Sequence, residues 1–204
     1  PQTFAYLSNH RIGQLPVLPG VAMCEMAMAA GVDVFRSRSV SVRNIEFPLA
    51  LSLREDDLET RQTLDAENCF TLSSKQGTHG RFRVSSDCLC KPRRWNAAIL
   101  GYVRNRCDVS CCDGEVLREV LMRNGYLGTF ASVTTAWRGI GEVLVRVDLR
   151  ESQGKWLDRV ALADCSTQAA LLLSAVGVDV AGGSMLIGMA EYAVMDVDAE
   201  LGDV

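Results

Sequence analysis

The sequence lacks the features that mark membrane, nucleic-acid-binding and secreted proteins. Its longest mostly apolar stretch, residues 169–178, is much shorter than the roughly 20 residues that a membrane-spanning helix needs. The formal net charge is −4, so no excess of basic residues favours nucleic acid as a partner. The first residues show no basic and apolar regions of a signal peptide. We therefore expect a cytoplasmic protein that binds neither nucleic acid nor membrane.

The composition is otherwise that of an ordinary globular protein. The 204 residues are 48% hydrophobic and 23% charged, which suits one large domain or two lobes with a real apolar core. The chain starts at Pro1 rather than at methionine. We expect it to be a segment of a longer polypeptide.

The eight cysteines form no recognisable framework. Cys88 and Cys90 are separated by one residue, and Cys107, Cys111 and Cys112 follow nearby. Structural zinc sites usually use two well-spaced pairs of ligands, and disulfide frameworks are typical of small secreted proteins. We therefore expect free thiols and no metal.

The first half of the chain has the pattern of one apolar helix followed by strands. Residues 20–31 (GVAMCEMAMAAG) are apolar on nearly every side, which predicts a buried helix that stops at its last glycine. Strands are expected at 40–53 and 94–103, with a hairpin formed by 70–74 and 81–85 around a turn at 77–80. Within the polar, cysteine-rich stretch that follows, residues 107–114 are the expected linker.

The second half repeats this order of elements without a repeat in sequence. Residues 113–124 predict an amphipathic helix, with Asp113 as its N-cap and Gly125 as its stop. The remaining predictions are strands at 130–137 and 142–149, a buried helix at 164–176 and a final strand at 185–197. The pattern predicts an α+β fold with one lobe at 1–106, the linker at 107–114 and a second lobe at 115–204.

Only two histidines occur, which narrows the search for a general base. His10 lies just before the loop LPVLPG and the first predicted helix. The N–H groups at the start of that helix would polarise a carbonyl oxygen placed there, and a neutral imidazole beside it could accept a proton from the adjacent carbon. The plain alternative is a histidine in a surface loop.

Asp164 and Gln168 lie four residues apart and therefore share one face of a predicted helix. Their apolar neighbours predict burial, which raises the pKa of a carboxyl group and favours its protonated form. A protonated Asp164 could donate to a departing hydroxyl while Gln168 fixes its orientation. The alternative is an N-cap aspartate with a glutamine one turn later.

Three motifs in this order resemble those of the polyketide synthase dehydratase family. The opening LSNHRIGQLPVLPG resembles LxDHxxxGxxxxPG, with His10, Pro19 and Gly20 in matching positions. The segment NGYLGTFASVTTAWRG resembles GYxYGPxFxxLxxxWRG, where Tyr126 and Phe130 match the motif. The segment LADCSTQAALLL resembles the helical motif LxDAxxQ, whose aspartate and glutamine are present here.

The resemblance implies a double hotdog fold, in which each of two lobes wraps antiparallel sheet around a buried helix, with the active site between the lobes. It implies that His10 removes the α-proton of a 3-hydroxyacyl group. Asp164, oriented by Gln168, would protonate the leaving β-hydroxyl, and the backbone N–H of Gly20 would polarise the thioester carbonyl.

The resemblance also implies how the substrate is held and delivered. Pro19, Tyr126 and Phe130 would line the substrate site, although Tyr126 can equally be a core aromatic. The acyl group would arrive on the phosphopantetheine arm of an acyl carrier protein, among other synthase domains and without a metal or organic cofactor. A homodimer is compatible with the family.

Basic residues cluster in the middle of the chain. We interpret this cluster as a solvated face, and the alternative is a docking patch for an acidic carrier protein. Its members are Lys91, Arg93, Arg94, Arg104 and Arg106.

Several departures from the motifs favour a rival hypothesis, a catalytically degenerate domain. Asn9 stands where the family usually has aspartate, Gln14 stands where the motif has glycine, and Leu127 and Gly128 replace glycine and proline. A product-template cyclase or thioesterase of the hotdog superfamily, or a non-catalytic scaffold, would also be compatible with the pattern.

Overall fold

The chain forms two compact units. The computed structural model describes residues 7–37, 39–54, 59–86, 97–107, 110–140, 142–149, 155–175 and 188–193. The unit named here the α2 unit comprises Val17–Arg94 and Met185–Glu200. The other, named here the α5 unit, comprises Pro1–Pro16, Trp95–Ser184 and Leu201–Val204.

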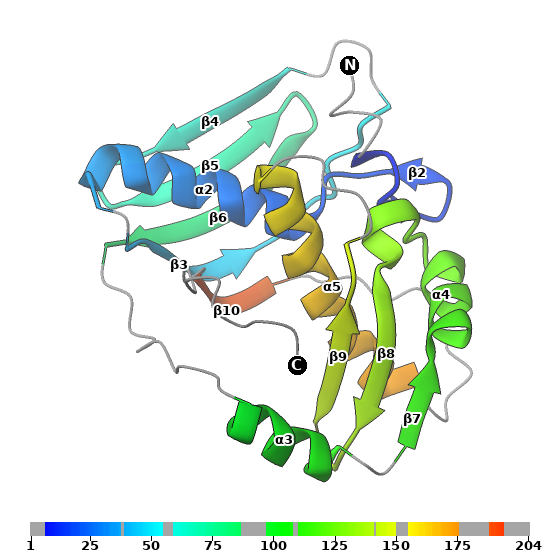
Figure 1. Ribbon diagram of the computed structural model, residues 1–204. Coiled ribbons are helices and arrows are strands. Elements are labelled where there is room, and N and C mark those ends of the chain that lie inside the picture. The colour runs from blue at the N-terminus through cyan, green and yellow to red at the C-terminus, as the bar shows by residue number, and fades with distance from the viewer. Residues whose placement is uncertain are drawn as a thin grey trace. The chain divides into compact units, whose positions relative to one another are not determined.

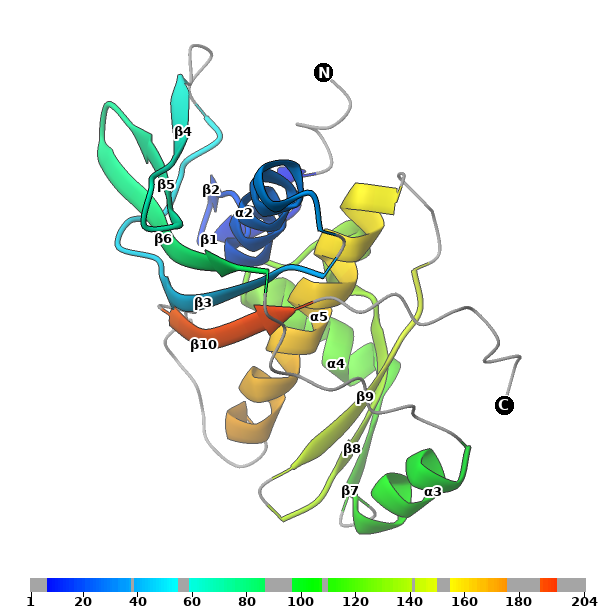
Figure 2. The ribbon, with the colours of Figure 1, turned by 90° about the vertical axis from the view of Figure 1, so that its left-hand side faces the viewer.

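The α2 unit consists of one helix packed on a five-stranded antiparallel sheet (Figures 1 and 2). The helix is α2 (Gly20–Phe35), and the sheet order is β10-β3-β6-β5-β4. Its strands are β3 (Ser41–Glu46), β4 (Thr60–Leu64), β5 (Cys69–Ser74), β6 (Gly77–Ser85) and β10 (Gly188–Ala193). Aliphatic and aromatic side chains from the helix and sheet form its core, among them Met23, Ala27, Val42, Phe70, Leu72 and Phe82.

Helix α2 is confirmed, but it ends at Phe35 rather than at Gly31. A methyl group on Gly31 would lie 2.5 Å from Val84 Cγ1 and 2.8 Å from Val40 Cγ1. This glycine therefore allows the helix to approach the sheet closely and does not end it. The helix ends where Arg36 adopts the left-handed conformation, with φ of 54°.

The strand predictions for the α2 unit are confirmed in part. The predicted hairpin is present, although β6 begins at Gly77 and the turn is therefore earlier than expected. The strand expected at 40–53 is only β3, whose pairing with β6 shifts register after Arg43, next to the positive φ of Asn44. The final predicted strand is β10, which pairs with β3. The sequence predicted this strand but not its partner.

The α5 unit places two helices against a three-stranded antiparallel sheet of order β7-β8-β9. The sheet strands are β7 (Ser110–Asp113), β8 (Val133–Arg138) and β9 (Val143–Val147), and the helices are α4 (Gly114–Arg123) and α5 (Lys155–Ala175). A short hairpin, β1 (Arg11–Ile12) with β2 (Leu15–Pro16), the helix α3 (Ala97–Arg106) and the 3-10 helix η1 (Gly128–Ala131) complete the unit. The core side chains include Leu117, Leu121, Val133, Ala136 and Cys165.

Two predictions for the α5 unit are wrong. The described part of the strand expected at 94–103 lies in the helix α3, in which Arg106 lies 4.9 Å from the ring centroid of Tyr102, one helical turn earlier. The expected linker at 107–114 contains β7, which pairs with β8. Polar composition suggested a loop, but antiparallel pairing satisfies the backbone groups of this segment. The division into lobes at 1–106 and 115–204 stays a prediction.

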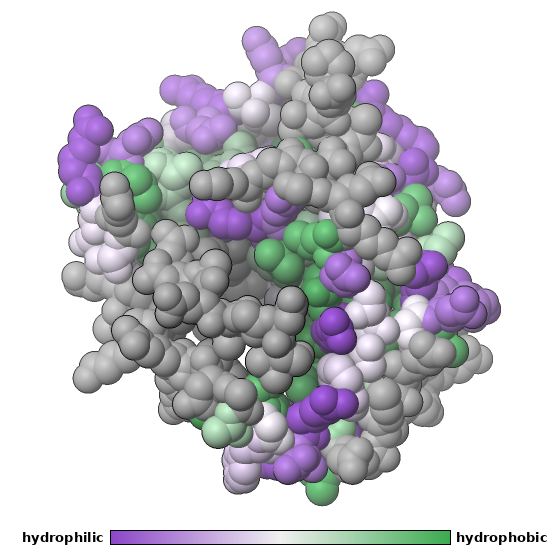
Figure 3. Space-filling view, in the orientation of Figure 1, coloured by the Kyte–Doolittle hydropathy of each residue, from purple (hydrophilic) through white to green (hydrophobic). Residues whose placement is uncertain are grey.

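The described surface carries exposed apolar side chains on several elements, and three of them, Ile99, Leu100 and Tyr102, lie on α3. Ile140, in the turn between β8 and β9, is 94% exposed, and Tyr102 on α3 is 63% exposed. In the space-filling view, apolar residues gather near the middle of the described part of the face shown, with hydrophilic residues around them (Figure 3). Among the helices in the described ranges, none has both the length and the hydropathy of a membrane span.

Candidate active site

The backbone around His10 is bonded to the segment that follows α4. His10 forms an isolated antiparallel bridge with this segment. On one side of the bridge the N–H of Arg11 donates to the carbonyl of Gly125 at 2.9 Å, and on the other the N–H of Leu127 donates to the carbonyl of Asn9 at 2.8 Å. These two bonds hold the backbone of His10 in place within the α5 unit.

Two aromatic rings flank the imidazole of His10. The ring centroid of Tyr126 lies 5.4 Å from that of His10 and the centroid of Phe130 lies 5.6 Å away, both in edge-to-face arrangements. Such packing limits the orientations that the imidazole can adopt. The structure therefore brings three predicted site residues together.

Asp164 lies inside helix α5, not at its start. The helix begins at Lys155, so the N-cap interpretation of Asp164 is wrong. The residue is only 5% exposed, and Gln168, one turn later, is fully buried. The side-chain amide of Gln168 donates to Asp164 Oδ2 at 2.9 Å and to the backbone carbonyl of Phe130 at 2.8 Å. The predicted pair on one helix face is present, with the glutamine orienting the carboxyl group.

The imidazole and the carboxyl group face each other across a short gap. His10 Nε2 lies 3.7 Å from Asp164 Oδ1, and the two side chains are 13% and 7% exposed. Burial raises the pKa of Asp164 above its ordinary value, while the nearby His10 and the hydrogen bond from Gln168 act in the opposite direction. The arrangement thus pairs a carboxyl group that favours its protonated form with an imidazole close by.

The groups beside this pair stay in their neutral forms. Burial is the main cause that raises the pKa of Tyr126, with a smaller contribution from Asp164. Burial also raises the pKa of Cys165 to about 12. A phenol and a thiol are therefore present at neutral pH rather than a phenolate and a thiolate, so Tyr126 can donate a hydrogen bond.

The predicted residues Pro19 and Gly20 belong to the α2 unit. Pro19 precedes the first residue of α2, and its carbonyl accepts a hydrogen bond from the N–H of Ala22 at 3.0 Å. A methyl group on Gly20 would lie 2.8 Å from the ring of Phe47, so the backbone passes close to that ring. The relation of these two residues to His10 stays a prediction.

Sequence reasoning missed the residues that hold His10. Gly125 was predicted only as the end of a helix, yet its carbonyl accepts one of the two hydrogen bonds that flank His10. Asn9 was noted only as a departure from the motif, yet its carbonyl is the other acceptor. Their positions in the sequence could have indicated this role, because Asn9 directly precedes His10 and Gly125 directly precedes Tyr126.

The cysteines with described side chains are free thiols, as predicted. They are Cys24, Cys69, Cys107 and Cys165. Cys88 and Cys90 lie outside the described residues. Within the described ranges, no three His, Cys, Asp or Glu side chains are grouped in a way that could hold a metal ion.

The described members of the basic cluster are engaged within the α5 unit. The Arg104 guanidinium lies 5.0 Å from the ring centroid of Trp137. Arg106 donates to Glu142 at 2.6 Å. These contacts favour a structural role for both arginines, while Lys91, Arg93 and Arg94 lie outside the described residues.

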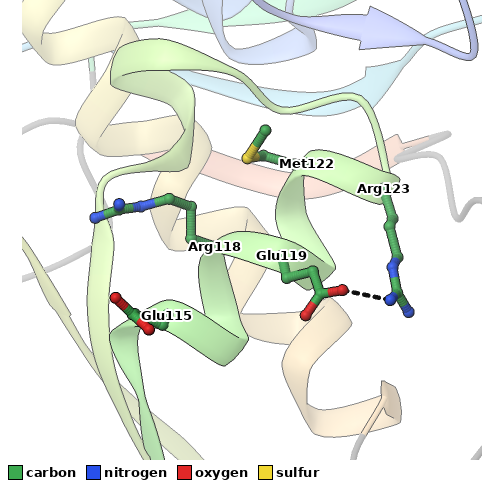
Figure 4. Close-up of a pocket in the computed structure, with 5 residues that line it drawn as sticks. All are labelled: Glu115, Arg118, Glu119, Met122 and Arg123. Carbon is green, nitrogen blue, oxygen red and sulfur yellow. Dashed lines mark hydrogen bonds and ion pairs between the residues drawn. The ribbon is translucent and has the colours of Figure 1, made fainter.

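Two hollows lie along α4. The larger, of about 570 Å³, is lined only by side chains of this helix, and Glu119 forms an ion pair with Arg123 there (Figure 4). The second, of about 350 Å³, shares Arg118 and Met122 with the first and also borders Asp148. Neither hollow is lined by the facing imidazole and carboxyl group.

Comparison with known proteins gives a consistent picture. A family model described as the polyketide synthase dehydratase domain matches residues 1–86. Phthioceranic/hydroxyphthioceranic acid synthases of Mycobacterium tuberculosis and Mycobacterium bovis are 28% identical over 186 residues, which cover 82% of this chain. The chain spans only 8% of the length of these curated relatives.

Solved structures of dehydratase domains share the fold. The dehydratase domain of a trans-AT polyketide synthase from Brevibacillus brevis has a TM-score of 0.74 at 20% identity, covering 91% of this chain and 71% of that one. The dehydratase domain of a mycocerosic acid synthase-like polyketide synthase has a TM-score of 0.67 at 23% identity, covering 92% and 69%. An inactive aspartate-to-asparagine mutant of the CurK dehydratase has a TM-score of 0.73 at 20% identity, covering 94% and 74%.

The chain is therefore similar to polyketide synthase dehydratase domains in its first 86 residues, in its relatives and in its fold. The solved dehydratase domains confirm the predicted α+β class and the double hotdog fold. The name of the family also gives the reaction class of its members, which is the removal of water. These relatives add no support to a cyclase or a thioesterase.

Proposed function

We propose that this dehydratase domain eliminates water from a 3-hydroxyacyl thioester on an acyl carrier protein and yields a 2-enoyl thioester. The observation that carries the proposal is the 3.7 Å separation of His10 Nε2 and Asp164 Oδ1 inside the α5 unit. Elimination of water needs a base and an acid that reach neighbouring carbons of one substrate, and this pair is close enough for that.

In the proposed step, His10 Nε2 accepts the proton from the α-carbon. The electrons of that C–H bond form the new double bond to the β-carbon, whose C–O bond breaks. Asp164 donates its proton to the departing hydroxyl, which leaves as water. The step ends with His10 protonated and Asp164 ionised, and transfer of a proton from the imidazole to the carboxylate restores both groups.

The surroundings of Asp164 suit the role of the acid. Burial raises its pKa, which keeps more of the carboxyl group protonated at a given pH. The Gln168 amide binds Oδ2 and leaves Oδ1 directed at His10. Gln168 itself is held by the Phe130 carbonyl, so the orientation of the acid depends on the backbone of η1.

The remaining assignments extend the proposal to the substrate and the partners. The N–H of Gly20 would polarise the thioester carbonyl, Tyr126 would bond the β-hydroxyl, and Pro19 and Phe130 would border the acyl chain. The phosphopantetheine arm of the carrier protein is the only prosthetic group that the step requires. A cytoplasmic location, neighbouring synthase domains and a homodimer belong to the same proposal.

Two inactive mutants of one protein of the same fold support the assignment of base and acid. In the CurK dehydratase, a histidine-to-phenylalanine and an aspartate-to-asparagine replacement each define an inactive mutant. The same pair of residue types faces each other here. The reaction therefore depends on a histidine and an aspartate in at least one domain of this fold.

The direct test is turnover of a 3-hydroxyacyl thioester mimic by the 204-residue chain, with the enoyl product followed by mass spectrometry. We expect water loss, hydration of the enoyl thioester in the reverse direction, and a decrease of roughly 10²–10⁴-fold for Asp164→Asn. Asp158→Asn, in the first turn of the same helix, is the matched control with unchanged turnover.

The rival hypotheses predict different outcomes of this experiment. A catalytically degenerate domain would fold and yet turn over neither the hydroxyacyl nor the enoyl thioester. A thioesterase would release a free acid, and a cyclase would form a ring without accumulation of the enoyl product. Equal turnover by Asp164→Asn and Asp158→Asn would overturn the proposed acid.

A further inference from the structure

One short segment is bonded to both halves of the proposed acid–base pair. At one end, residues 125–127 form the two backbone hydrogen bonds that flank His10. At the other end, the Phe130 carbonyl accepts a hydrogen bond from Gln168, whose amide also binds Asp164. The described segment 125–130, named here the brace, thus connects the base to the acid through backbone groups.

At its first residue, Gly125, the brace contacts Arg11 of β1 so closely that only glycine fits. Gly125 has a φ of +91°, a backbone angle that residues with a side chain rarely adopt. A methyl group there would lie 2.2 Å from the carbonyl oxygen of Arg11. Since the clash is with a backbone atom, no rotation of a side chain can relieve it, and the brace and β1 would have to separate.

The brace makes a second close approach at Gly128. This residue has a φ of +53°, and a methyl group there would lie 2.7 Å from Nδ2 of Asn9. Proline, which the family motif has at this position, cannot adopt a positive φ. The two departures from the motif, Asn9 and Gly128, are therefore neighbours in the structure and fit each other.

We infer that the brace sets the separation of His10 and Asp164, with Gly125 and Gly128 as positioning residues and Asn9 as the side chain matched to Gly128. The inference rests on the proposed function, because it assigns the two ends of the brace to a base and an acid. Misplacement of reacting groups by about 1 Å can lower a rate by about 10²-fold, so a small shift of the brace is measurable.

The chain offers matched variants that separate positioning from general strain. Gly125→Ala and Gly128→Ala disturb the brace. Gly13→Ala places alanine at a similar φ of +60°, close in sequence to His10 but with no atom within 4 Å of the new methyl group. Gly101→Ala, inside α3, also adds its methyl group to open space.

We expect the turnover number to fall by about 10²-fold in Gly125→Ala and by a smaller factor in Gly128→Ala. The double variant Asn9→Ala/Gly128→Ala should recover part of the loss, because the atom that would clash has been removed. Gly13→Ala and Gly101→Ala should keep the turnover number of the parent chain.

A spectroscopic measurement tests the brace without any turnover. With only two histidines in the chain, ¹⁵N-histidine NMR resolves His10, while His79 serves as an internal reference in the α2 unit. Asp164→Asn should displace the His10 signals and leave the His79 signals in place. In the Gly125→Ala background this displacement should shrink, because imidazole and carboxyl group have moved apart.

The two measurements distinguish failure of the inference from failure of the proposed function. Absence of water loss in the parent chain refutes the function, and the NMR displacement still decides on the brace. An unchanged displacement and turnover number in Gly125→Ala overturn the brace alone. If Gly125→Ala does not fold, Gly128→Ala decides: partial recovery in the double variant supports the brace, and equality with Gly13→Ala overturns it.

Discussion

The two histidines of the chain have opposite surroundings. His79, in the α2 unit, is fully buried, with Nε2 2.7 Å from Ser74 Oγ and Nδ1 3.1 Å from the Leu49 carbonyl. His10, in the α5 unit, keeps 13% of its side chain exposed, and its Nε2 faces a carboxyl oxygen at 3.7 Å. Both ring nitrogens of His79 are bonded to neutral partners. The ring of His10 faces the carboxyl group of Asp164 across a gap longer than a hydrogen bond.

This comparison shows how a structural histidine differs from a candidate base. A ring with both nitrogens bonded inside a core contributes hydrogen bonds to folding and has no access to a substrate. A partly exposed ring next to a buried carboxyl group contributes little to folding, while the buried carboxyl group is costly. The four predictions that follow test this difference, from the largest expected effect to the smallest.

The largest effect is expected on turnover from His10→Gln. Loss of the proposed base should lower the turnover number by roughly 10²–10⁴-fold. His79→Gln, which makes the same change in the α2 unit, should keep the turnover number in every molecule that remains folded. Steady-state kinetics on both variants, normalised to the folded fraction by circular dichroism, provides the comparison. Equal losses in the two variants would contradict the assignment of His10.

The next effect is on stability, where the replacement of His79 should matter more than the replacement of His10. His79→Gln should lower the free energy of unfolding by about 1–3 kcal/mol, because Ser74 and Leu49 lose well-placed partners inside a core. His10→Gln should change this free energy by less than about 1 kcal/mol, since it removes mainly ring contacts at a partly exposed position. Urea titrations followed by tryptophan fluorescence measure both values. A larger loss from His10→Gln would reverse the comparison.

A third prediction concerns pH. Since burial raises the pKa of Asp164 above its ordinary value of 3.8, the folded chain holds this proton at pH values where the unfolded chain has released it. The stabilisation is complete below 3.8 and is lost as the pH rises through the raised pKa. The slope reaches at most about 1.4 kcal/mol per pH unit.

Asp164→Asn serves as the reference for this measurement. Urea titrations at several pH values give the unfolding free energy of the parent chain and of the variant. As the pH rises, the parent chain should lose stability relative to the variant. His79→Gln should leave the pH dependence of this difference intact, because His79 belongs to the α2 unit and Asp164 to the α5 unit. A difference that stays constant with pH would show that Asp164 ionises in the folded chain as it does in the unfolded chain.

The smallest effect is expected from Cys165→Ala, next to the proposed acid. The residue is fully buried among core side chains, and its thiol stays protonated because its pKa is raised to about 12. Loss of the sulfur should lower the free energy of unfolding by about 1 kcal/mol and leave turnover unchanged. A large loss of turnover would show that the thiol takes part in the reaction.

The sequence predicted individual site residues better than their supports. The four-residue spacing of Asp164 and Gln168 predicted a shared helix face, and their hydrogen bond at 2.9 Å is confirmed. Apolar neighbours predicted the burial that raises the pKa of Asp164, and this is confirmed as well. Both features follow from local periodicity, because a helix determines which neighbours share a face.

The failures concern segments whose structure depends on distant contacts. The segment at 94–103 was short and apolar, a pattern that fits a strand or a helix equally well. Its described part is helical, and Arg104 packs over the ring of Trp137, which lies on β8. Likewise, β10 pairs with β3 from the other end of the chain, and no local pattern names such a partner.

The sequence by itself determined the α+β class, the apolar helices and the residue types of the acid–base pair, since all of these depend on composition and spacing along one element. Only the tertiary structure decided that His10 faces Asp164 at 3.7 Å and that a backbone bridge beside Gly125 holds it there. The physical reason is that hydrogen bonds and close packing between distant segments are sensitive to changes in distance of a few tenths of an ångström. Those distances are fixed by the fold as a whole and not by the spacing of residues in the chain.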